Sequence, residues 1–262
     1  MKAYVTRTKR QELRKKKCKR IVIALAVLAV LCLIGMVAVP QLINNDRVIL
    51  SGISNKGSNS VVDSDPSSIP EYSGEDYIVL NKGIPNFNAW DLENISGEKY
   101  SDLDGLGRCG VAYAMLDRFM MPTEERESIG QVKPSGWVQA KYEGIVNSEP
   151  PYLYNRCHLI AYALTGQNAN EKNLITGTRY MNVTTMLPWE EQVMKYLDDS
   201  ENHVLYRVTP YFQGEELVAR GVELEAYSVE DNGESLCFHV FVYNVQPGIV
   251  IDYRTGESSI EK

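Results

Sequence analysis

The chain has 262 residues, a length that suits one or two domains. Its net charge of −7 is divided unevenly, because residues 1–20 hold ten Lys and Arg and a single acidic residue. Of the 27 basic and 34 acidic residues, 17 and 33 therefore lie in residues 21–262, which carry a net charge of −16. This acidic body argues against binding of nucleic acid through a broad basic surface. A metal ion and a few arginines can still provide positive charge in one small site.

The twenty residues 21–40 contain no charged side chain and are almost entirely apolar. A helix of this length, at about 1.5 Å per residue, spans the roughly 30 Å hydrocarbon core of a membrane. Because the basic residues 1–20 precede the run, the positive-inside rule predicts a cytoplasmic tail, a transmembrane helix at 21–40 and an extracellular body. The alternative is a cleaved signal peptide. The run exceeds the usual apolar region of about 7–15 residues, however, and lacks a small-x-small cleavage site before Pro40.

Residues 41–75 are predicted to form a flexible linker. From residue 44 onwards they are rich in Ser, Gly, Asn, Asp and Pro, and they contain too few apolar side chains to form a core. The remaining residues, 76–262, are predicted to form one domain. Three of the five cysteines fall in this domain, Cys109, Cys157 and Cys237, so at most one disulfide can form within it. Their spacing does not match a structural zinc site.

The hydrophobic pattern predicts an α+β domain, with strands and helices in separate runs. Its first elements are a strand at 77–80, a helix at 110–121 ended by Pro122, a helix that begins within 159–164, and a helical pattern over 180–198 interrupted by Pro188. Three segments that alternate apolar and polar side chains follow and are predicted to be antiparallel strands, at 204–210, 218–228 and 237–244. The turn Asp231-Asn232-Gly233 is predicted to join the second of these strands to the third.

Among the three histidines, His158 is the candidate for catalysis. His239 lies within the alternating segment 237–244, which indicates a residue on a strand face, and His203 follows an acidic surface turn. His158 instead follows Arg156 closely at a predicted strand-to-helix transition. An unperturbed histidine titrates near about 6.5 and can act as a general base, but a lone histidine is often structural. The residues alone leave both roles open.

A polar cluster of unusual composition follows His158 and contains Asn168, Asn170 and Asn173. Further along the chain, Asn182 falls within the predicted helical pattern, where asparagine is unfavourable. It is therefore a member of a buried network or a ligand, unless it is a solvated helix position. Asn182 and Glu190 are eight residues apart, about 80° around a helix, so they can share a face if Pro188 does not displace the turn.

The segment Asn155-Arg156-Cys157-His158 resembles the Asp-Arg-Gly-His motif of the DNA/RNA non-specific endonucleases. The closest likeness is to the DNA-entry (competence) nucleases of Gram-positive bacteria. Further matches lie at residues 106–108, 120–124, 133–137 and 168–179. The last of these matches is long and has an unusual composition, so it is a specific indicator of this family. The resemblance extends over residues 76–255.

The resemblance implies a ββα-metal (His-Me finger) nuclease domain with an antiparallel sheet, preceded by one transmembrane helix. His158 matches the general base that takes a proton from the attacking water. Asn182 matches the single protein ligand of Mg²⁺, for which Mn²⁺ can substitute, and such a site is plausible because Mg²⁺ keeps most of its waters. Glu190 matches the acid that orients those waters, and Asn173 an asparagine that supports the site. Arginines that hold the phosphate and stabilise transition-state charge are matched by Arg156, Arg108 and Arg179.

The implied activity is metal-dependent hydrolysis of phosphodiester bonds in DNA and/or RNA at the cell surface. Little sequence preference is expected, because nothing in this scheme reads bases. The main alternative is a catalytically inactive surface protein that binds nucleic acid during DNA uptake. A structural surface domain and a nuclease toxin delivered to other cells are further alternatives. No obligate protein partner is expected.

Two residues depart from the family motif. Asn155 replaces the aspartate, and its amide can accept a hydrogen bond but supplies no charge. Cys157 replaces the glycine and removes the backbone freedom that glycine gives. Neither residue replaces the base or the metal ligand, so activity is expected, with a shifted pH optimum. Cys157 either pairs with Cys109 or stays a small buried side chain, and the second is favoured.

Overall fold

The computed structural model describes residues 58–62 and 69–262. The predicted cytoplasmic tail, the predicted transmembrane helix at 21–40 and most of the predicted linker lie outside these residues. Within the part of the chain that the structure describes, no helix is both long enough and apolar enough to cross a membrane.

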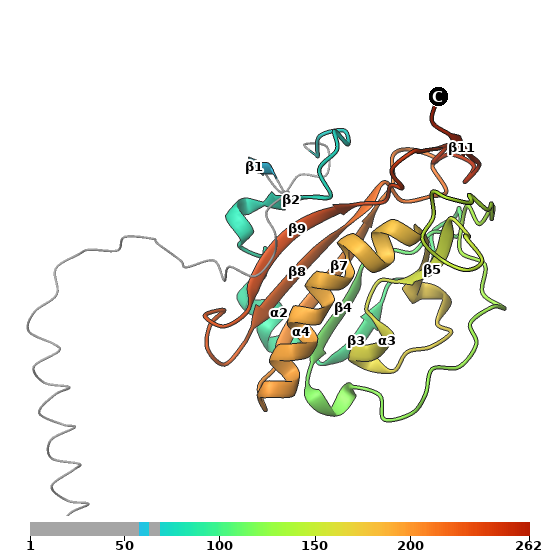
Figure 1. Cartoon of the computed structure of the whole chain (residues 1–262). Coiled ribbons are helices and arrows are strands. Elements are labelled where there is room, and N and C mark those ends of the chain that lie inside the picture. Colours follow the sequence, from blue (N-terminus) through green and yellow to red (C-terminus); the bar gives the residue numbers. More distant parts are fainter. Residues whose placement is uncertain (1–57, 63–68) are drawn as a thin grey trace, which may run out of the picture. The chain divides into compact units, whose positions relative to one another are not determined.

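A seven-stranded sheet forms the framework of the domain (Figure 1). Its strands lie in the order β1-β2-β9-β8-β7-β4-β3, and neighbours are antiparallel except β1 and β2. The strands are β1 Ser58–Val62, β2 Tyr77–Leu80, β3 Gly97–Tyr100, β4 Ala112–Leu116, β7 Val204–Tyr211, β8 Gly221–Ser228 and β9 Cys237–Tyr243. β2, β7, β8 and β9 confirm the four predicted strands. The predicted turn between β8 and β9 is also present, with φ values of 56° at Asn232 and 76° at Gly233.

Two elements of the sheet differ from the sequence-based expectation. The segment predicted as a helix at 110–121 forms β4 and a 3₁₀ turn, Arg118–Met120. Ala112, Ala114 and Leu116 are fully buried while the residues between them are half-buried, so the period is that of a strand. Pairing with β3 and β7 on both sides overrides the helical propensity of Ala, Leu and Met. In addition, β1 lies within the predicted linker and pairs with β2.

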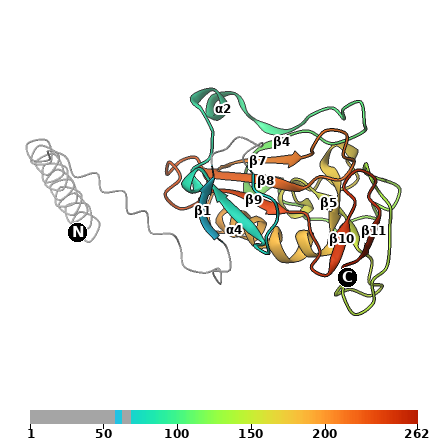
Figure 2. The ribbon, with the colours of Figure 1, turned by 90° about the horizontal axis from the view of Figure 1, so that it is seen from above.

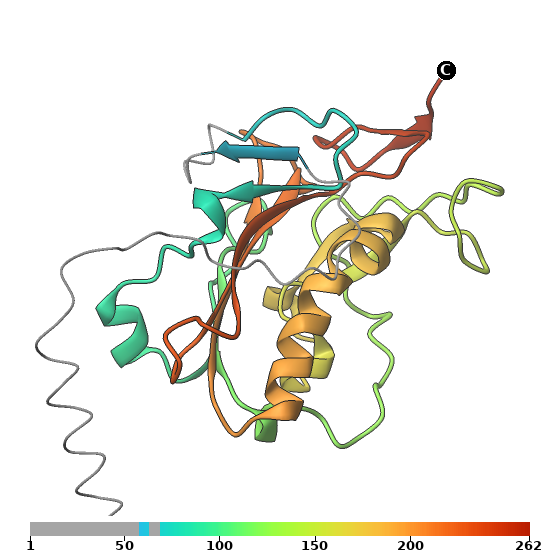
Figure 3. The ribbon, with the colours of Figure 1, turned by 60° about the vertical axis from the view of Figure 1, so that its left-hand side comes forward.

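The long strands present two different faces. The side chains of Val222, Leu224 and Ala226 belong to the main hydrophobic core, together with Val193 of helix α4 (Leu187–Asp199). We call this side the helical face. The alternate residues on β7, β8 and β9 point to the opposite side, the outer face, which helix α2 (Ala89–Asn94) and the segment before it cover. Figures 2 and 3 show α4 and α2 on opposite sides of the sheet.

A separate hairpin lies on the helical face. It consists of β5 (Tyr154–His158) and β6 (Leu174–Thr178), which pair antiparallel. The connection between them contains the short helix α3 (Tyr162–Thr165), within the predicted helical region, and a 3₁₀ turn, Glu171–Asn173. A π-turn at Met181–Thr185 and then α4 follow β6, which completes a ββα unit. The remaining elements are the 3₁₀ turn Asn81–Gly83 and the hairpin of β10 (Ile249–Ile251) and β11 (Ser258–Ile260).

Pro188 does not interrupt the helix in the way the sequence suggested. It lies in the first turn of α4, where a backbone N–H has no partner within the helix. The irregularity instead comes before it, at the π-turn, where the Met186 N–H donates to the Met181 carbonyl oxygen five residues back at 2.8 Å. The helical pattern at 180–198 is therefore correct in extent but divided at a different point.

Candidate active site

His158 is the last residue of β5 and is only 6% exposed. Its Nε2 lies 2.9 Å from the Asn168 carbonyl oxygen, which can only accept a hydrogen bond, so Nε2 carries the proton. Nδ1 lies 3.3 Å from Nη2 of Arg126, which can only donate. These two partners assign the neutral tautomer in which Nδ1 has a free lone pair. Nδ1 is therefore the ring atom that can accept a proton.

The surroundings hold His158 in its neutral form. Burial lowers the pKa of the imidazole to about 4, and the positive charge of Arg126 contributes to the same shift. Both effects disfavour the imidazolium, since desolvation and a nearby cation each oppose a second positive charge. His158 is therefore able to accept a proton at any pH above about 4.

Asn173 fixes the chain immediately after His158. This side chain is fully buried. Its Oδ1 accepts from the Ile160 N–H and its Nδ2 donates to the Ile160 carbonyl oxygen, both at 2.9 Å. The Asn173 backbone carbonyl also accepts from the Leu159 N–H at 2.9 Å. Asn173 therefore sets the direction of the backbone that leaves β5, which supports the position of His158 without a hydrogen bond to its ring.

Asn182 and Glu190 project from the helical part of the ββα unit. Asn182 is half-buried in the π-turn, and within residues 69–262 its side-chain amide makes no hydrogen bond. The π-turn adds one residue to a helical turn, so Asn182 and Glu190 are related as if they were seven residues apart. This corresponds to an angular offset of about 20° instead of the roughly 80° expected for a regular helix. From this offset we expect the two predicted metal-site residues to share one face.

Glu190 is an unusual buried acid. It is 6% exposed, and no arginine or lysine of the described residues pairs with it. Burial, with a smaller contribution from Glu191, raises the pKa of its carboxyl group to about 8. The hydroxyl of Tyr206, on β7, is buried without a hydrogen-bond partner, and Glu190 is close enough to help raise its pKa. Glu190 therefore lacks the cation that a buried carboxylate normally needs.

The three arginines predicted to hold phosphate lie in different surroundings. Arg156 stacks on the Trp137 ring at 4.3 Å and donates to the carbonyl oxygens of Val132 and Gly130. Arg108 pairs with Asp104 at 2.7 Å and donates to two carbonyl oxygens at residues 214 and 216. Arg179 differs, because its Nε is buried without a hydrogen-bond partner. Arg156 and Arg108 thus hold loops, whereas Arg179 has a buried Nε that no hydrogen bond engages.

Arg126 is a site residue that the sequence reasoning missed. It lies in the loop between the turn Arg118–Met120 and β5, and it contacts His158 from 32 residues earlier in the chain. In the sequence it stands between Glu125 and Glu127, which indicates a solvated charged run. The only signal for it was its place next to residues 120–124, one of the segments that carry the family resemblance.

Cys157 is a buried thiol, as favoured from the sequence, and does not form a disulfide. Its side chain occupies space beside Gly177 on β6. A Cβ added to Gly177 would lie 2.6 Å from the Cβ of Cys157 and 2.8 Å from the Cε of Met181, which is too close for real atoms. The departure from the motif glycine at position 157 is therefore accommodated by a glycine on the opposite strand.

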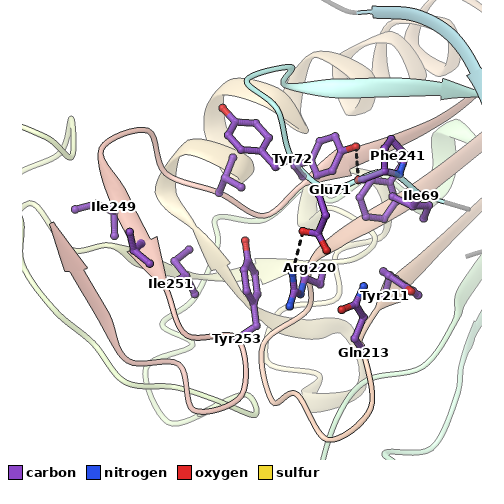
Figure 4. Close-up of a pocket in the computed structure, with 14 residues that line it drawn as sticks. Ile69, Glu71, Tyr72, Tyr211, Gln213, Arg220, Phe241, Ile249, Ile251 and Tyr253 are labelled. Carbon is purple, nitrogen blue, oxygen red and sulfur yellow. Dashed lines mark hydrogen bonds and ion pairs between the residues drawn. The ribbon is translucent and has the colours of Figure 1, made fainter. Parts of the chain in front are cut away.

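Two other features lie away from His158. Glu223, Glu225 and His239 bring possible metal-ligand atoms within 4.8 Å of one another, but they lie on the outer face. A cavity of about 230 Å³ is lined mainly by tyrosines and apolar side chains, among them Tyr72, and by Arg220 (Figure 4). Arg220 pairs there with Glu71 at 3.4 Å and, more closely, with Glu216. None of the predicted site residues belongs to either feature.

A family model described as DNA/RNA non-specific endonuclease matches residues 88–230. A curated deoxyribonuclease from Streptococcus dysgalactiae subsp. equisimilis is 27% identical over 201 residues, which is 62% of this chain and 60% of that protein. The structure of NucA from Streptococcus agalactiae with magnesium bound is 30% identical, with a TM-score of 0.60 over 70% of this chain and 86% of that one.

The structure of the Sda1 nuclease with bound zinc is also similar, at 27% identity and a TM-score of 0.58 over 71% of this chain and 97% of that one. These matches confirm the family resemblance that residues 155–158 and 168–179 carry. The mixed α/β fold with its antiparallel sheet agrees with the fold that the resemblance implied.

Proposed function

Because the chain belongs to the DNA/RNA non-specific endonuclease family, we propose that it is a metal-dependent endonuclease that hydrolyses DNA and/or RNA with little sequence preference. The observation that carries this proposal is the neutral His158 at the end of β5, with Nδ1 as its proton-accepting atom. Asn182 and Glu190, which offer oxygen ligands, follow on the helical part of the same ββα unit.

In the proposed reaction, Nδ1 of His158 accepts a proton from the attacking water. The Asn168 carbonyl oxygen keeps the ring oriented through Nε2, and this orientation fixes which nitrogen reacts. Arg126 must first leave Nδ1, since its guanidinium occupies the side from which water approaches. A substrate phosphate would draw Arg126 away from Nδ1, because a guanidinium binds phosphate oxygens in a bidentate geometry. Substrate binding thus exposes the base.

The residues present fit a magnesium ion. Asn182 has an amide oxygen without a competing hydrogen bond. Glu190 is an acid whose pKa is raised by burial and, to a smaller extent, by Glu191. Oxygen donors of this kind are the ligands of Mg²⁺, with Mn²⁺ as a substitute. When bound, the ion would stabilise negative charge on the scissile phosphate and on the leaving oxygen. We assign Asn182 as its protein ligand and Glu190 as the acid that orients its waters.

The remaining assignments follow from the contacts of each side chain. Arg179, with unused donor capacity, is proposed to bind a substrate phosphate, together with Arg126. Arg156 is proposed to contribute to catalysis indirectly. It holds the loop at residues 130–132, which lies between Arg126 and β5 in the chain. Arg108 is proposed to contribute to substrate binding in the same indirect way, through the loop at 214–216. Asn173 supports the base.

A direct test uses the full chain purified in detergent, with plasmid DNA and RNA as substrates. We expect cleavage with Mg²⁺ and none with excess EDTA. Asn182→Ala should lower the rate by orders of magnitude and raise the Mg²⁺ concentration needed for half-maximal rate. The matched control is Gln192→Ala, which removes another half-buried amide from the same helical segment. Cleavage that persists in EDTA, or an unchanged Mg²⁺ dependence of Asn182→Ala, would overturn the metal assignment.

We also propose that the domain lies outside the cell and is tethered through residues 21–40. This rests on the apolar run and on the basic residues that precede it. Mild protease treatment of intact cells should release an active soluble fragment by cutting between residues 41 and 57, ahead of β1. Release only after lysis would place the domain inside, where a non-specific nuclease would attack the chromosome of its own cell.

A further inference from the structure

The outer face contains a buried charged group that the proposed reaction does not use. Arg207, Glu225 and His239 lie side by side on β7, β8 and β9, in register across the three strands. Glu223 stands two residues before Glu225 on β8. His239 is 0% exposed and Glu225 1%. Charged groups are rarely buried in this way unless their charges are compensated.

The hydrogen bonds of His239 leave one nitrogen in conflict with its neighbour. Nδ1 lies 3.0 Å from the Ile84 carbonyl oxygen, so Nδ1 carries the proton. Nε2 lies 2.5 Å from Oε1 of Glu223 and 3.9 Å from Oε1 of Glu225. A neutral imidazole would therefore direct a lone pair at two carboxylates. A positive species must lie between Nε2 and these oxygens.

The charges nearby do not remove this conflict. Arg207 is engaged by Glu225 through Nε and Nη2, at 2.5 and 2.8 Å. Asp91 of α2 also interacts electrostatically with the same guanidinium. Glu223 lies at Nε2 of His239 and has no ion pair with Arg207. With a neutral His239, the two carboxylates of Glu223 and Glu225 therefore share a single guanidinium, and the group has a surplus of negative charge. This surplus attracts a cation to the Nε2 side of His239.

We propose that a divalent transition-metal ion, with zinc as the best match, binds between His239 and Glu223, with Glu225 as a weaker third ligand. Imidazole nitrogen and carboxylate oxygen are zinc ligands, and a metal-bound histidine usually donates its other N–H to a carbonyl oxygen, as Nδ1 does here. Bonds of about 2.0–2.1 Å put neighbouring ligand atoms of a tetrahedral ion roughly 3.3 Å apart. The observed separations of 2.5 and 3.9 Å from Nε2 lie on either side of this value.

The ion would fasten the segment before α2 to the sheet. The Ile84 carbonyl oxygen holds His239, and the Asn86 N–H donates to Oε1 of Glu225 at 2.7 Å. Both ligand-bearing strands thus contact the same stretch of chain. The site is on the outer face, because the residues next to His239 and Glu225 along their strands belong to the main core. Figure 2 shows α2, which covers the outer face, on the other side of the sheet from α4. The role of the ion is therefore structural and separate from the metal proposed at Asn182.

The test is zinc binding by the full chain, stripped with EDTA in detergent and then dialysed against Zn²⁺. His239→Gln should bind one zinc ion fewer per chain than the wild type. The matched control is His203→Gln, because His203 also pairs with a glutamate at 2.5 Å but is exposed and has one carboxylate only. This control should bind as many ions as the wild type. The test compares the number of zinc ions bound by each variant with the number bound by the wild type. Because all of these proteins keep Asn182, a metal at that residue adds equally to each and does not affect the difference.

Thermal unfolding gives a second readout. Zinc at 100 times its Kd should raise the Tm of the wild type and of His203→Gln by roughly 5–10 °C, and should raise that of His239→Gln less. If His239→Gln does not fold, Glu223→Gln replaces it, since the Glu223 side chain is 13% exposed and tolerates an amide. Equal zinc binding by the wild type and these variants would overturn the proposal and identify the cation on Nε2 as a proton.

Discussion

His158 and His239 are both buried, and each has one ring nitrogen next to a backbone carbonyl oxygen. Their second nitrogens face opposite charges. Nδ1 of His158 faces the guanidinium of Arg126, whereas Nε2 of His239 faces Glu223 and Glu225. The first environment keeps an imidazole neutral and ready to accept a proton, while the second demands a positive species. The helical face and the outer face of one sheet thus give the same residue type two different chemistries.

The largest expected difference between the two histidines is the effect of their substitution on the rate of cleavage. His158→Ala should lower the rate of plasmid cleavage by about 10²–10⁴-fold, the usual contribution of a general base. His239→Gln should stay within a few-fold of the wild type, because it lies on the opposite face of the sheet from the ββα unit. Circular dichroism should show that both variants fold. A His158→Ala variant within tenfold of the wild-type rate would mean that the base lies elsewhere.

Glu190 sharpens the comparison, because it is a buried acid of the helical face without the partner that Glu225 has in Arg207. Its pKa of about 8 in the folded state lies above the value of 4.5 for an ordinary glutamate. The folded protein therefore holds a proton that the unfolded chain has lost, and stability falls as pH rises through this window.

His158 has a pKa of about 4 in the folded state and 6.5 as an ordinary histidine. Its contribution makes stability rise with pH between these two values and is constant above pH 6.5. Between pH 6.5 and 8, metal-free wild type should lose about 2 kcal/mol of unfolding free energy, a slope of roughly 1.4 kcal/mol per pH unit. Denaturant titrations in EDTA should show this slope, and Glu190→Gln should lack it. Mg²⁺ should reduce it in the wild type. An equal slope in both proteins would assign the pH dependence to another group.

The close packing of the hairpin of β5 and β6 offers a third contrast. Gly177→Ala should destabilise the fold by about 1–3 kcal/mol, because its new methyl group would overlap Cys157 and Met181. Gly105→Ala is the control, since nothing lies within 4 Å of a Cβ at that position. Combining Gly177→Ala with Cys157→Gly should recover part of the loss in denaturant titrations. Additive losses in the double variant would mean that the two side chains do not compete for one space.

The smallest expected effect concerns the acid limb of the pH–rate profile. Arg126→Ala removes a positive charge from beside His158, so the pKa of the imidazole should rise from about 4 toward its ordinary value of 6.5. The acid limb of kcat/KM should move to higher pH, apart from any loss of substrate binding. Arg118→Ala, an exposed arginine in the same connection, should leave the limb in place. A limb that stays fixed in Arg126→Ala would mean that burial alone sets the pKa.

Much of the framework follows from local patterns in the sequence. Strands β7, β8 and β9 have apolar residues at the alternate positions that face the main core, and this period is visible in the residues themselves. The segment 112–116 was misjudged because alanine, methionine and leucine favour helices, and only pairing with β3 and β7 makes it a strand. Local propensity does not contain information about such neighbours.

The candidate site also has features that the sequence determined and features that only the structure decided. The sequence alone determined the run at 21–40, the acidic body and the motif around His158, since each is written in consecutive residues. Only the tertiary structure decided that Arg126 lies next to Nδ1 of His158, and that the chain forms a π-turn at Asn182. Contacts between residues far apart in the chain, and the loss of water around them, set these charges and directions. Such effects arise only when the chain is folded.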